Sequence, residues 1–269
     1  MQPLSDFPKD TLKNIRFILT DIDDTLTENG RLPAKSYQAL ERLKQAGLKV
    51  IPITGRPAGW CDHIARMWPV DGVVGENGAF YFIYNSTLRK MRQRYWKNEN
   101  ERAADRKELE QLRKIILDEV EGSSVASDQA FREADLAIDF CEDIPALSQS
   151  AIDQIVNIFE QAGAIAKVSS IHVNGWFGNY DKLSMTRILF AECFQTDMDL
   201  AQDQIVFCGD SPNDEPMFGF FENSVGVANV LDFVDTMEQQ PCWITKNRTA
   251  SGFVELSEVI LNARSATSI

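Results

Sequence analysis

The sequence predicts an α/β fold, in which a doubly wound parallel sheet carries an inserted α/β domain. Strand patterns alternate with helical patterns over the first 80 residues and again after residue 178, as is typical of a parallel sheet with helices on both faces. Strands and helices follow another order between about residues 85 and 177. We therefore expect a core formed by residues 1–84 and 178–269, with the inserted domain over 85–177.

Each element is predicted from its hydrophobic period and its flanking residues. In the first core segment we expect strands over 16–20, 48–53 and 72–75, helices over 34–46 and 58–67, and a hairpin of 80–84 with 88–95. In the insertion we expect helices over 101–119 and 145–161, and strands over 136–140, 166–173 and 176–177. The second core segment then gives helices over 182–193, 215–220 and 252–261, and strands over 204–208 and 224–228.

Charge and composition exclude several classes of partner. The 269 residues contain 27 Lys and Arg against 40 Asp and Glu, a formal charge of -13, which repels a nucleic-acid backbone. No stretch approaches the roughly 20 apolar residues that span a bilayer, and the N-terminus has no secretory pattern. The five cysteines form no CxxC pair, so we expect a reduced, cytoplasmic protein without membrane partners. The sequence predicts no oligomeric state.

Polar clusters follow four of the predicted core strands. They are Asp21 to Thr25, Thr54-Gly55-Arg56, Glu76-Asn77-Gly78, and Gly209 to Asp214. Ligands of an open parallel sheet bind beyond the carboxyl ends of its strands. Because crowded carboxylates repel one another unless a cation lies among them, the clusters predict a Mg²⁺ site.

The residue types suggest a division of roles in phosphoryl transfer. Asp21, directly after its strand, is placed to attack phosphorus, and Asp23 points to the same side, to serve as acid and then base. Asp210 would complete the shell of the ion, and Asp214 would ligate it directly or through water. A solvated, helix-capping acidic turn is the structural alternative.

The remaining core motifs supply donors for a phosphoryl group. Thr54 offers a hydroxyl, Gly55 an unshielded backbone N–H, and Lys182 a cation beside Asp21. Lys167 is the competitor of Lys182, and Thr54 is also suited to cap the following helix. We also expect Arg56, Glu76, Asn77 and Asn213 to contact the substrate. A structural loop role is an equal alternative for Arg56, Glu76 and Asn77.

Four of these motifs, in this order, resemble those of the haloacid dehalogenase (HAD) superfamily of phosphohydrolases. They are DIDDTLT over 21–27, Ile53-Thr54-Gly55-Arg56, Asp181-Lys182, and GDSPND over 209–214. The resemblance implies a Rossmann-like core, Asp21 as nucleophile, Asp23 as acid and base, and Thr54 and Lys182 as phosphoryl binders. It also implies that Mg²⁺ is held by Asp21, by the backbone carbonyl of Asp23 and by Asp210.

The insertion resembles the large α/β cap of HAD subclass IIB, which includes sucrose phosphatase, mannosyl-3-phosphoglycerate phosphatase and eukaryotic-type phosphomannomutases. Glu76 to Ala79 and Ser251 to Val254 also resemble features of that group. Two residues depart from the pattern, because Asp24 and Leu183 each stand where glycine is usual. The sequence assigns no role to Asp24.

The cap is expected to set specificity. Ser170, His172 and Asn174 alternate along one predicted strand face, so all three are candidates to contact the alcohol part of a substrate, with a plain half-exposed strand as the alternative. Trp176 is expected in the core and His63 in packing or on the surface. The predicted function is a Mg²⁺-dependent phosphomonoester hydrolase that forms an aspartyl-phosphate and acts on a small phosphorylated metabolite, with sugar phosphates first. The alternatives are a phosphomutase or phosphotransferase and a catalytically idle binding module.

Overall fold

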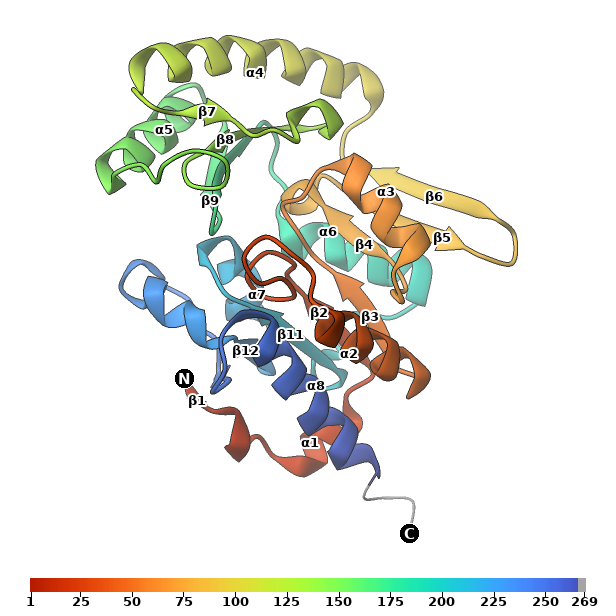
Figure 1. Ribbon diagram of the computed structural model, residues 1–269. Helices are drawn as coiled ribbons and strands as arrows, with labels where there is room; N and C mark the ends of the chain where they lie inside the picture. The colour runs from red at the N-terminus through yellow and green to blue at the C-terminus, as the bar shows by residue number, and fades with distance from the viewer. Residues whose placement is uncertain (266–269) are drawn as a thin grey trace.

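A six-stranded parallel sheet forms the centre of the larger part of the protein in the computed structural model, which describes residues 1–265 (Figure 1). Its strand order is β1-β13-β12-β11-β2-β3, and all five pairings are parallel. The two central strands are buried on both faces, which explains their continuous apolar sequences. The strands are β1 (Gln2–Pro3), β2 (Phe17–Thr20), β3 (Lys49–Pro52), β11 (Ile205–Gly209), β12 (Ser224–Gly226) and β13 (Trp243–Ile244).

Helices cover both faces of this sheet, so the predicted fold class is confirmed. One apolar cluster joins the sheet to α1 (Lys9–Asn14), α2 (Ala34–Gln45), α3 (Ala58–Met67) and α8 (Thr249–Ser265). A second cluster joins the other face to α6 (Lys182–Leu189) and α7 (Glu215–Phe220).

The predicted hairpin is confirmed, and it belongs by hydrogen bonding to the core side. Strand β5 (Phe80–Asn85) pairs with β6 (Lys90–Tyr95) and with β4 (Val73–Gly75), all antiparallel. A parallel bridge between Ile53 and Val74 connects β4 to the edge of the central sheet. The expected domain boundaries stay a prediction, but this pairing favours a first boundary near Trp96 over one at residue 85.

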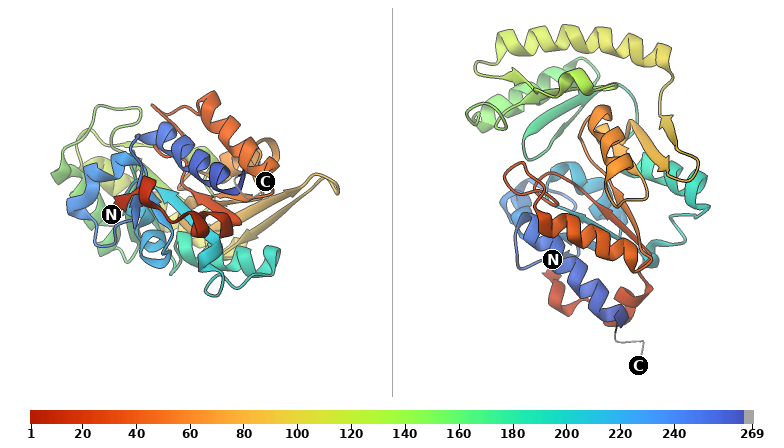
Figure 2. Two further views of the ribbon diagram at one scale, coloured as in Figure 1. Left: turned by 90° about the horizontal axis from the view of Figure 1, so that it is seen from below. Right: turned by 45° about the vertical axis from the view of Figure 1, so that its right-hand side comes forward.

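The insertion folds into a separate antiparallel sheet of order β7-β8-β10-β9. Two helices, α4 (Glu99–Glu119) and α5 (Gln149–Gln161), pack on one of its faces. Both views show these helices on the side away from the core, so the other sheet face is turned toward it (Figures 1 and 2). We call this part the cap; its strands are β7 (Ser124–Val125), β8 (Asp135–Asp139), β9 (Ile165–Val168) and β10 (His172–Trp176).

The structure corrects several predicted elements. The single strand expected over 166–173 is broken, because the Ser169 hydroxyl accepts hydrogen bonds from the N–H groups of Ile171 and His172 and closes a turn. The helix expected to reach residue 193 ends its regular part at Leu189 and continues as a π-helical turn, Phe190–Phe194. Short elements such as α1, β1, β7 and β13 were not predicted. Within residues 1–265, none of the helices has the length and apolar character needed to span a membrane.

Candidate active site

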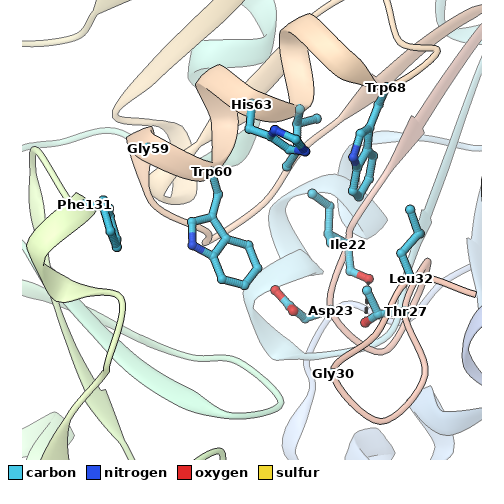
Figure 3. Close-up of a pocket in the computed structure, with 11 residues that line it drawn as sticks. Ile22, Asp23, Thr27, Gly30, Leu32, Gly59, Trp60, His63, Trp68 and Phe131 are labelled. Carbon is cyan, nitrogen blue, oxygen red and sulfur yellow. Dashed lines mark hydrogen bonds between the residues drawn. The ribbon is translucent and has the colours of Figure 1, made fainter.

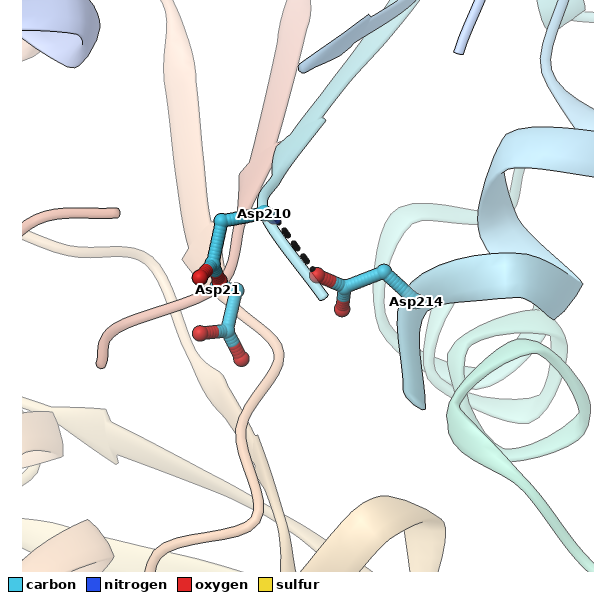
Figure 4. Close-up of side chains that lie close together, drawn as sticks. All are labelled: Asp21, Asp210 and Asp214. Atoms are coloured by element: carbon cyan, nitrogen blue, oxygen red, sulfur yellow. Dashed lines mark hydrogen bonds between the residues drawn. The ribbon is translucent and has the colours of Figure 1, made fainter. Parts of the chain in front are cut away.

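Three carboxylates meet at the carboxyl ends of the central strands (Figure 4). Asp21 follows β2 and Asp210 follows β11, and these strands are paired in parallel with Thr20 beside Cys208, so the two side chains start from adjacent strand ends. Asp214 comes from the turn before α7. One oxygen of each of these buried carboxylates lies within 4.8 Å of the others. The acidic strand ends predicted from the sequence are therefore brought together.

Lys182 is the cation of this cluster. Its Nζ lies 2.8 Å from Oδ1 of Asp21 and 2.6 Å from Oδ1 of Asp214, and its side chain is fully buried. Asp181 caps α6 by accepting a hydrogen bond from the Ser184 N–H, which fixes the helix start that carries Lys182. The competitor Lys167 lies on β9 in the cap instead.

The charges of the cluster are unbalanced without a further cation. Burial raises the pKa of Asp21 to about 8 despite the opposing charge of Lys182, and Asp214 and Asp23 add to the rise. Burial, with the charges of Asp21 and Asp214, also raises the pKa of Asp210 well above its usual range. Three buried carboxylates with one lysine are a donor set that suits a hard divalent ion such as Mg²⁺. Asp21, Asp210 and Asp214 would hold it.

Asn229 is a site residue that the sequence reasoning missed. Its Nδ2 donates to Oδ2 of Asp210 (2.9 Å) and to the backbone carbonyl of Asp24 (3.1 Å), while the hydroxyl of Thr25 donates to the other oxygen of Asp210 (3.2 Å). Both donors therefore orient Asp210 within the cluster. A signal was present, because Asn229 comes shortly after β12, at the same edge of the sheet as the other polar clusters.

Asp23 lies beside the cluster but is paired with another cation. Both of its oxygens accept hydrogen bonds from Arg56, at 2.8 to 3.0 Å. The same guanidinium binds two cap carboxylates, Asp128 at 3.2 Å and Glu142 at 2.7 Å. Arg56 therefore connects the expected acid–base residue to the cap, and a phosphate contact by Arg56 would require an exchange of partners.

Glu76 was expected to contact the substrate, but its partners in the structure are backbone groups of the protein. Its buried carboxylate accepts hydrogen bonds from the N–H of Ala58, at the start of α3, and from the N–H groups of Glu133, Ala134 and Asp135 in the cap. A carboxylate at this helix end also interacts favourably with the helix dipole. Because all these donors are backbone groups of core and cap, we correct the interpretation of Glu76 to a structural connection between them.

Arg132 is a second connection between core and cap, and no sequence pattern pointed to it. Its guanidinium binds Asp128 and Asp135 within the cap and donates to the backbone carbonyl of Gly55 in the core (2.9 Å). Arg132 and both carboxylates are buried. A buried arginine whose pairs are complete orients the neighbouring groups but is not a free anion binder.

The core donors expected for the phosphoryl group surround Gly55. The hydroxyl of Thr54 accepts a hydrogen bond from the Arg56 N–H (3.0 Å), so Thr54 orders this turn. Nδ2 of Asn77 is buried and has no hydrogen-bond partner among residues 1–265, while Oδ1 of Asn77 accepts from Asn213 (3.4 Å). An unpartnered buried amide beside the acidic cluster is suited to donate a hydrogen bond to an anionic ligand.

The cap residues predicted to contact substrate face the core. Ser170, His172 and Asn174 line one small cavity together with Asp21, Asp23 and Asn213, and its volume is about 10 Å³. His172 Nε2 lies 2.8 Å from Glu142, and Asn174 donates to Asp135 (2.8 Å). The structure thus brings these residues to the site, although His172 and Asn174 are buried.

Asp24, to which the sequence assigned no role, has a left-handed backbone with φ of 51°. Burial raises the pKa of its carboxyl, while the hydroxyl of Ser170 in the cap lowers it. The left-handed conformation explains why glycine is usual at this position of the motif.

Comparison with known proteins agrees with this geometry. Residues 18–116 match the haloacid dehalogenase-like hydrolase family. The chain is 24% identical to the phosphoglycolate phosphatase of Methanobrevibacter smithii over 253 residues, which are 91% of this chain and 98% of that protein. It is 30% identical to the phosphoglycolate phosphatase of Methanoculleus marisnigri over 78 residues, 28% of this chain and 33% of that one.

Solved structures share the fold at low sequence identity. The protein 0175 of Thermoplasma acidophilum has a TM-score of 0.69 at 18% identity, over 92% of this chain and 98% of that one. The sucrose-phosphatase of Synechocystis has a TM-score of 0.60 at 16% identity, over 92% and 98%. The HAD subclass IIB sugar phosphatase BT4131 has a TM-score of 0.60 at 12% identity, over 92% and 99%. Part of the chain therefore matches the haloacid dehalogenase-like hydrolase family, and the chain as a whole shares its fold with solved phosphatases.

Proposed function

We propose that this phosphatase hydrolyses small phosphomonoesters with Mg²⁺ bound by Asp21, Asp210 and Asp214. The observation that carries the proposal is the buried cluster of these carboxylates around Lys182 at the carboxyl ends of β2 and β11. When bound, the ion would neutralise charge on the phosphoryl oxygens and on the carboxylates. The backbone carbonyl of Asp23 stays the fourth expected ligand.

In the proposed reaction, an oxygen of Asp21 attacks phosphorus, and the bond from phosphorus to the leaving oxygen breaks. Asp23 gives its proton to that oxygen, then takes a proton from a water molecule that attacks the aspartyl-phosphate and releases phosphate. Lys182, 2.8 Å from Asp21, would balance charge on the transferring group. Because both oxygens of Asp23 accept hydrogen bonds from Arg56, substrate binding must loosen this pair before Asp23 reaches the leaving oxygen.

Sugar phosphates are our first candidates for the substrate. Among the proteins of similar fold are a sucrose-phosphatase and a sugar phosphatase, and the cap offers hydroxyl and imidazole groups on the face turned to the site. Phosphoglycolate is the second candidate, because two curated relatives are phosphoglycolate phosphatases. We expect the protein to act in the cytoplasm, without nucleic-acid or membrane partners.

A screen of phosphorylated metabolites, with released phosphate as the readout, tests this proposal. Wild-type protein with Mg²⁺ should release phosphate, and Asp21→Asn should not. Conversion of a sugar phosphate into an isomer without phosphate release would instead indicate a mutase. Absence of turnover on every substrate, including a generic aryl phosphate, would favour the idle binding module.

A further inference from the structure

A cavity of about 450 Å³ opens beside Asp23 (Figure 3). The loop after β2, helix α3 and the cap residue Phe131 enclose it. Its walls are mostly apolar, with the rings of Trp60, Trp68 and Phe131 as the largest surfaces. This cavity has no role in the proposed chemistry so far.

Two of these rings are unusually accessible for aromatic side chains. Trp60 is 41% exposed and Phe131 is 57% exposed. The indole of Trp60 is held in place by the guanidinium of Arg56, 4.4 Å from its ring centre. Gly59 lets Phe131 approach, because a Cβ at Gly59 would lie 2.9 Å from Cβ of Phe131. Fixed, exposed aromatic rings around a concave space are typical of a ligand pocket.

Asp23 connects this cavity to the reacting groups. It lines both the large cavity and the small cavity beside Asp21, which at about 10 Å³ has room for roughly one water molecule. A third cavity of about 160 Å³ borders Lys182 and Lys167, but Asp23 is not among its lining residues. The leaving oxygen must come within hydrogen-bond reach of Asp23, so the rest of the leaving group needs a space that Asp23 borders.

We propose that the large cavity binds the leaving group of the substrate and selects a leaving group with a ring that has an apolar face. This inference rests on the proposed phosphatase function. The polar side-chain groups at the cavity are few, namely those of Asp23, Thr27 and His63 and the indole N–H groups of Trp60 and Trp68. A chain of hydroxyl or carboxylate groups would therefore lose more hydrogen bonds to water than the cavity replaces. An aromatic ring and the C–H face of a sugar ring share the required chemistry.

Three substrates and two variants test the proposal. We expect Trp60→Ala and Phe131→Ala to lower kcat/KM at least tenfold, mainly through KM, for 1-naphthyl phosphate or for glucose 6-phosphate. Hydrolysis of phosphoglycolate, which has no ring, should stay within about twofold. The substrate that loses more identifies the source of the ring, aromatic or sugar. Because Trp60 is 41% exposed and Phe131 57% exposed, and neither belongs to a buried apolar cluster, their truncation should leave the fold intact.

Matched controls separate this role from a general effect. Met67→Ala removes another exposed apolar side chain of α3 (63% exposed), and Lys167→Ala alters the cavity beside Lys182; neither should change the preference for ring-bearing substrates. Equal losses on all three substrates, or a preference moved by Lys167→Ala alone, would overturn the proposal.

Failure of the phosphatase function itself gives a different result, because no substrate is then cleaved by the wild type. Calorimetric binding of 1-naphthyl phosphate to the Mg²⁺-loaded protein still tests the cavity in that case. Binding that weakens at least tenfold in Trp60→Ala supports the assignment, and absence of binding to the wild type contradicts it.

Discussion

Asp24 stands where its motif usually has glycine, and its φ of 51° accounts for the usual residue. A side chain in the left-handed region costs free energy, less for aspartate than for most residues. We expect Asp24→Gly to raise the free energy of unfolding by about 0.5–1 kcal/mol, measured by urea denaturation. Asp24→Ala removes the same carboxylate but keeps the strained backbone, so it should be less stable than Asp24→Gly. Equal stabilities of the two variants would contradict the view that the stability change comes from the left-handed backbone.

Asn229 illustrates how a residue outside the acidic cluster acts on it. Its amide and the Thr25 hydroxyl occupy one oxygen each of Asp210. Groups that orient a metal ligand typically change metal affinity by about 10–100-fold when removed. We expect Asn229→Ala to weaken Mg²⁺ binding by this factor in a calorimetric titration. The control is Asn223→Ala, which removes a buried amide bound to backbone carbonyls outside the site. This control should leave the Mg²⁺ affinity unchanged. An equal loss of Mg²⁺ affinity in both variants would refute the orienting role of Asn229.

At the scale of elements, Glu142 is one of the groups that connect β10 to the core, because it lies 2.8 Å from His172 Nε2 and 2.7 Å from Arg56. Burial opposes its ionisation, but His172 and Arg56 together lower its pKa to about 2. A carboxyl whose folded pKa is depressed stabilises the protein above its unfolded pKa, near 4.3, and this contribution is lost as the pH falls toward 2.

We therefore expect the Glu142→Gln variant to lose less stability than the wild type as the pH falls from about 5 to about 3. The difference in unfolding free energy should be about 1–2 kcal/mol, after allowance for solvent screening of this half-buried group. Thermal unfolding at several pH values measures it. Glu258→Gln removes a carboxylate from an exposed pair with Arg42 and is the control; if both variants show the same pH profile as the wild type, Glu142 does not contribute as described.

The elements that the sequence predicted well are those with a long hydrophobic period. Helix α3 has the predicted bounds, Ala58–Met67. Strand β2 starts one residue later than predicted, and β11 is shifted by one residue at both ends. The turn at Ser169–Ile171 was missed because it depends on one hydroxyl that replaces strand hydrogen bonds. Two-residue strands such as β7 and β13 are defined only by their partners, so a local pattern does not reveal them.

At the scale of the whole molecule, one part of the candidate site could be predicted from the sequence and the other part could not. Asp21, Asp210, Asp214 and Lys182 could be predicted because parallel strands bring their carboxyl ends to one edge. The ion pairs of Arg56 with the cap and the hydrogen bond from Arg132 to Gly55 could not, because Asp128, Glu142 and Arg132 belong to the cap and only the docking of core and cap creates those contacts. The same docking gives Glu76 its backbone partners.

The close contact between cap and core also leads us to expect that the cap must move during catalysis. With about 10 Å³ beside Asp21, a phosphomonoester enters only when the cap moves away. A Cβ at Gly59 would lie 2.9 Å from Cβ of Phe131, closer than the roughly 3.5–4.5 Å of a disulfide, so a small shift of the cap is enough to form one. Gly59→Cys with Phe131→Cys should therefore lose phosphatase activity on oxidation and regain it with reductant. The single-cysteine variants should not respond to oxidant in this way. Full activity of the cross-linked double variant would contradict the need for cap opening.

The central claim is that Asp21 forms the covalent intermediate, and acid quenching during turnover of an aryl phosphate tests it most directly. Mass spectrometry of the peptide that contains residues 17–24 should find one phosphoryl group on Asp21 in the wild type and none in Asp21→Asn, whose turnover should fall at least about a thousandfold. A phosphoryl group on another residue, or undiminished turnover by Asp21→Asn, would contradict the account.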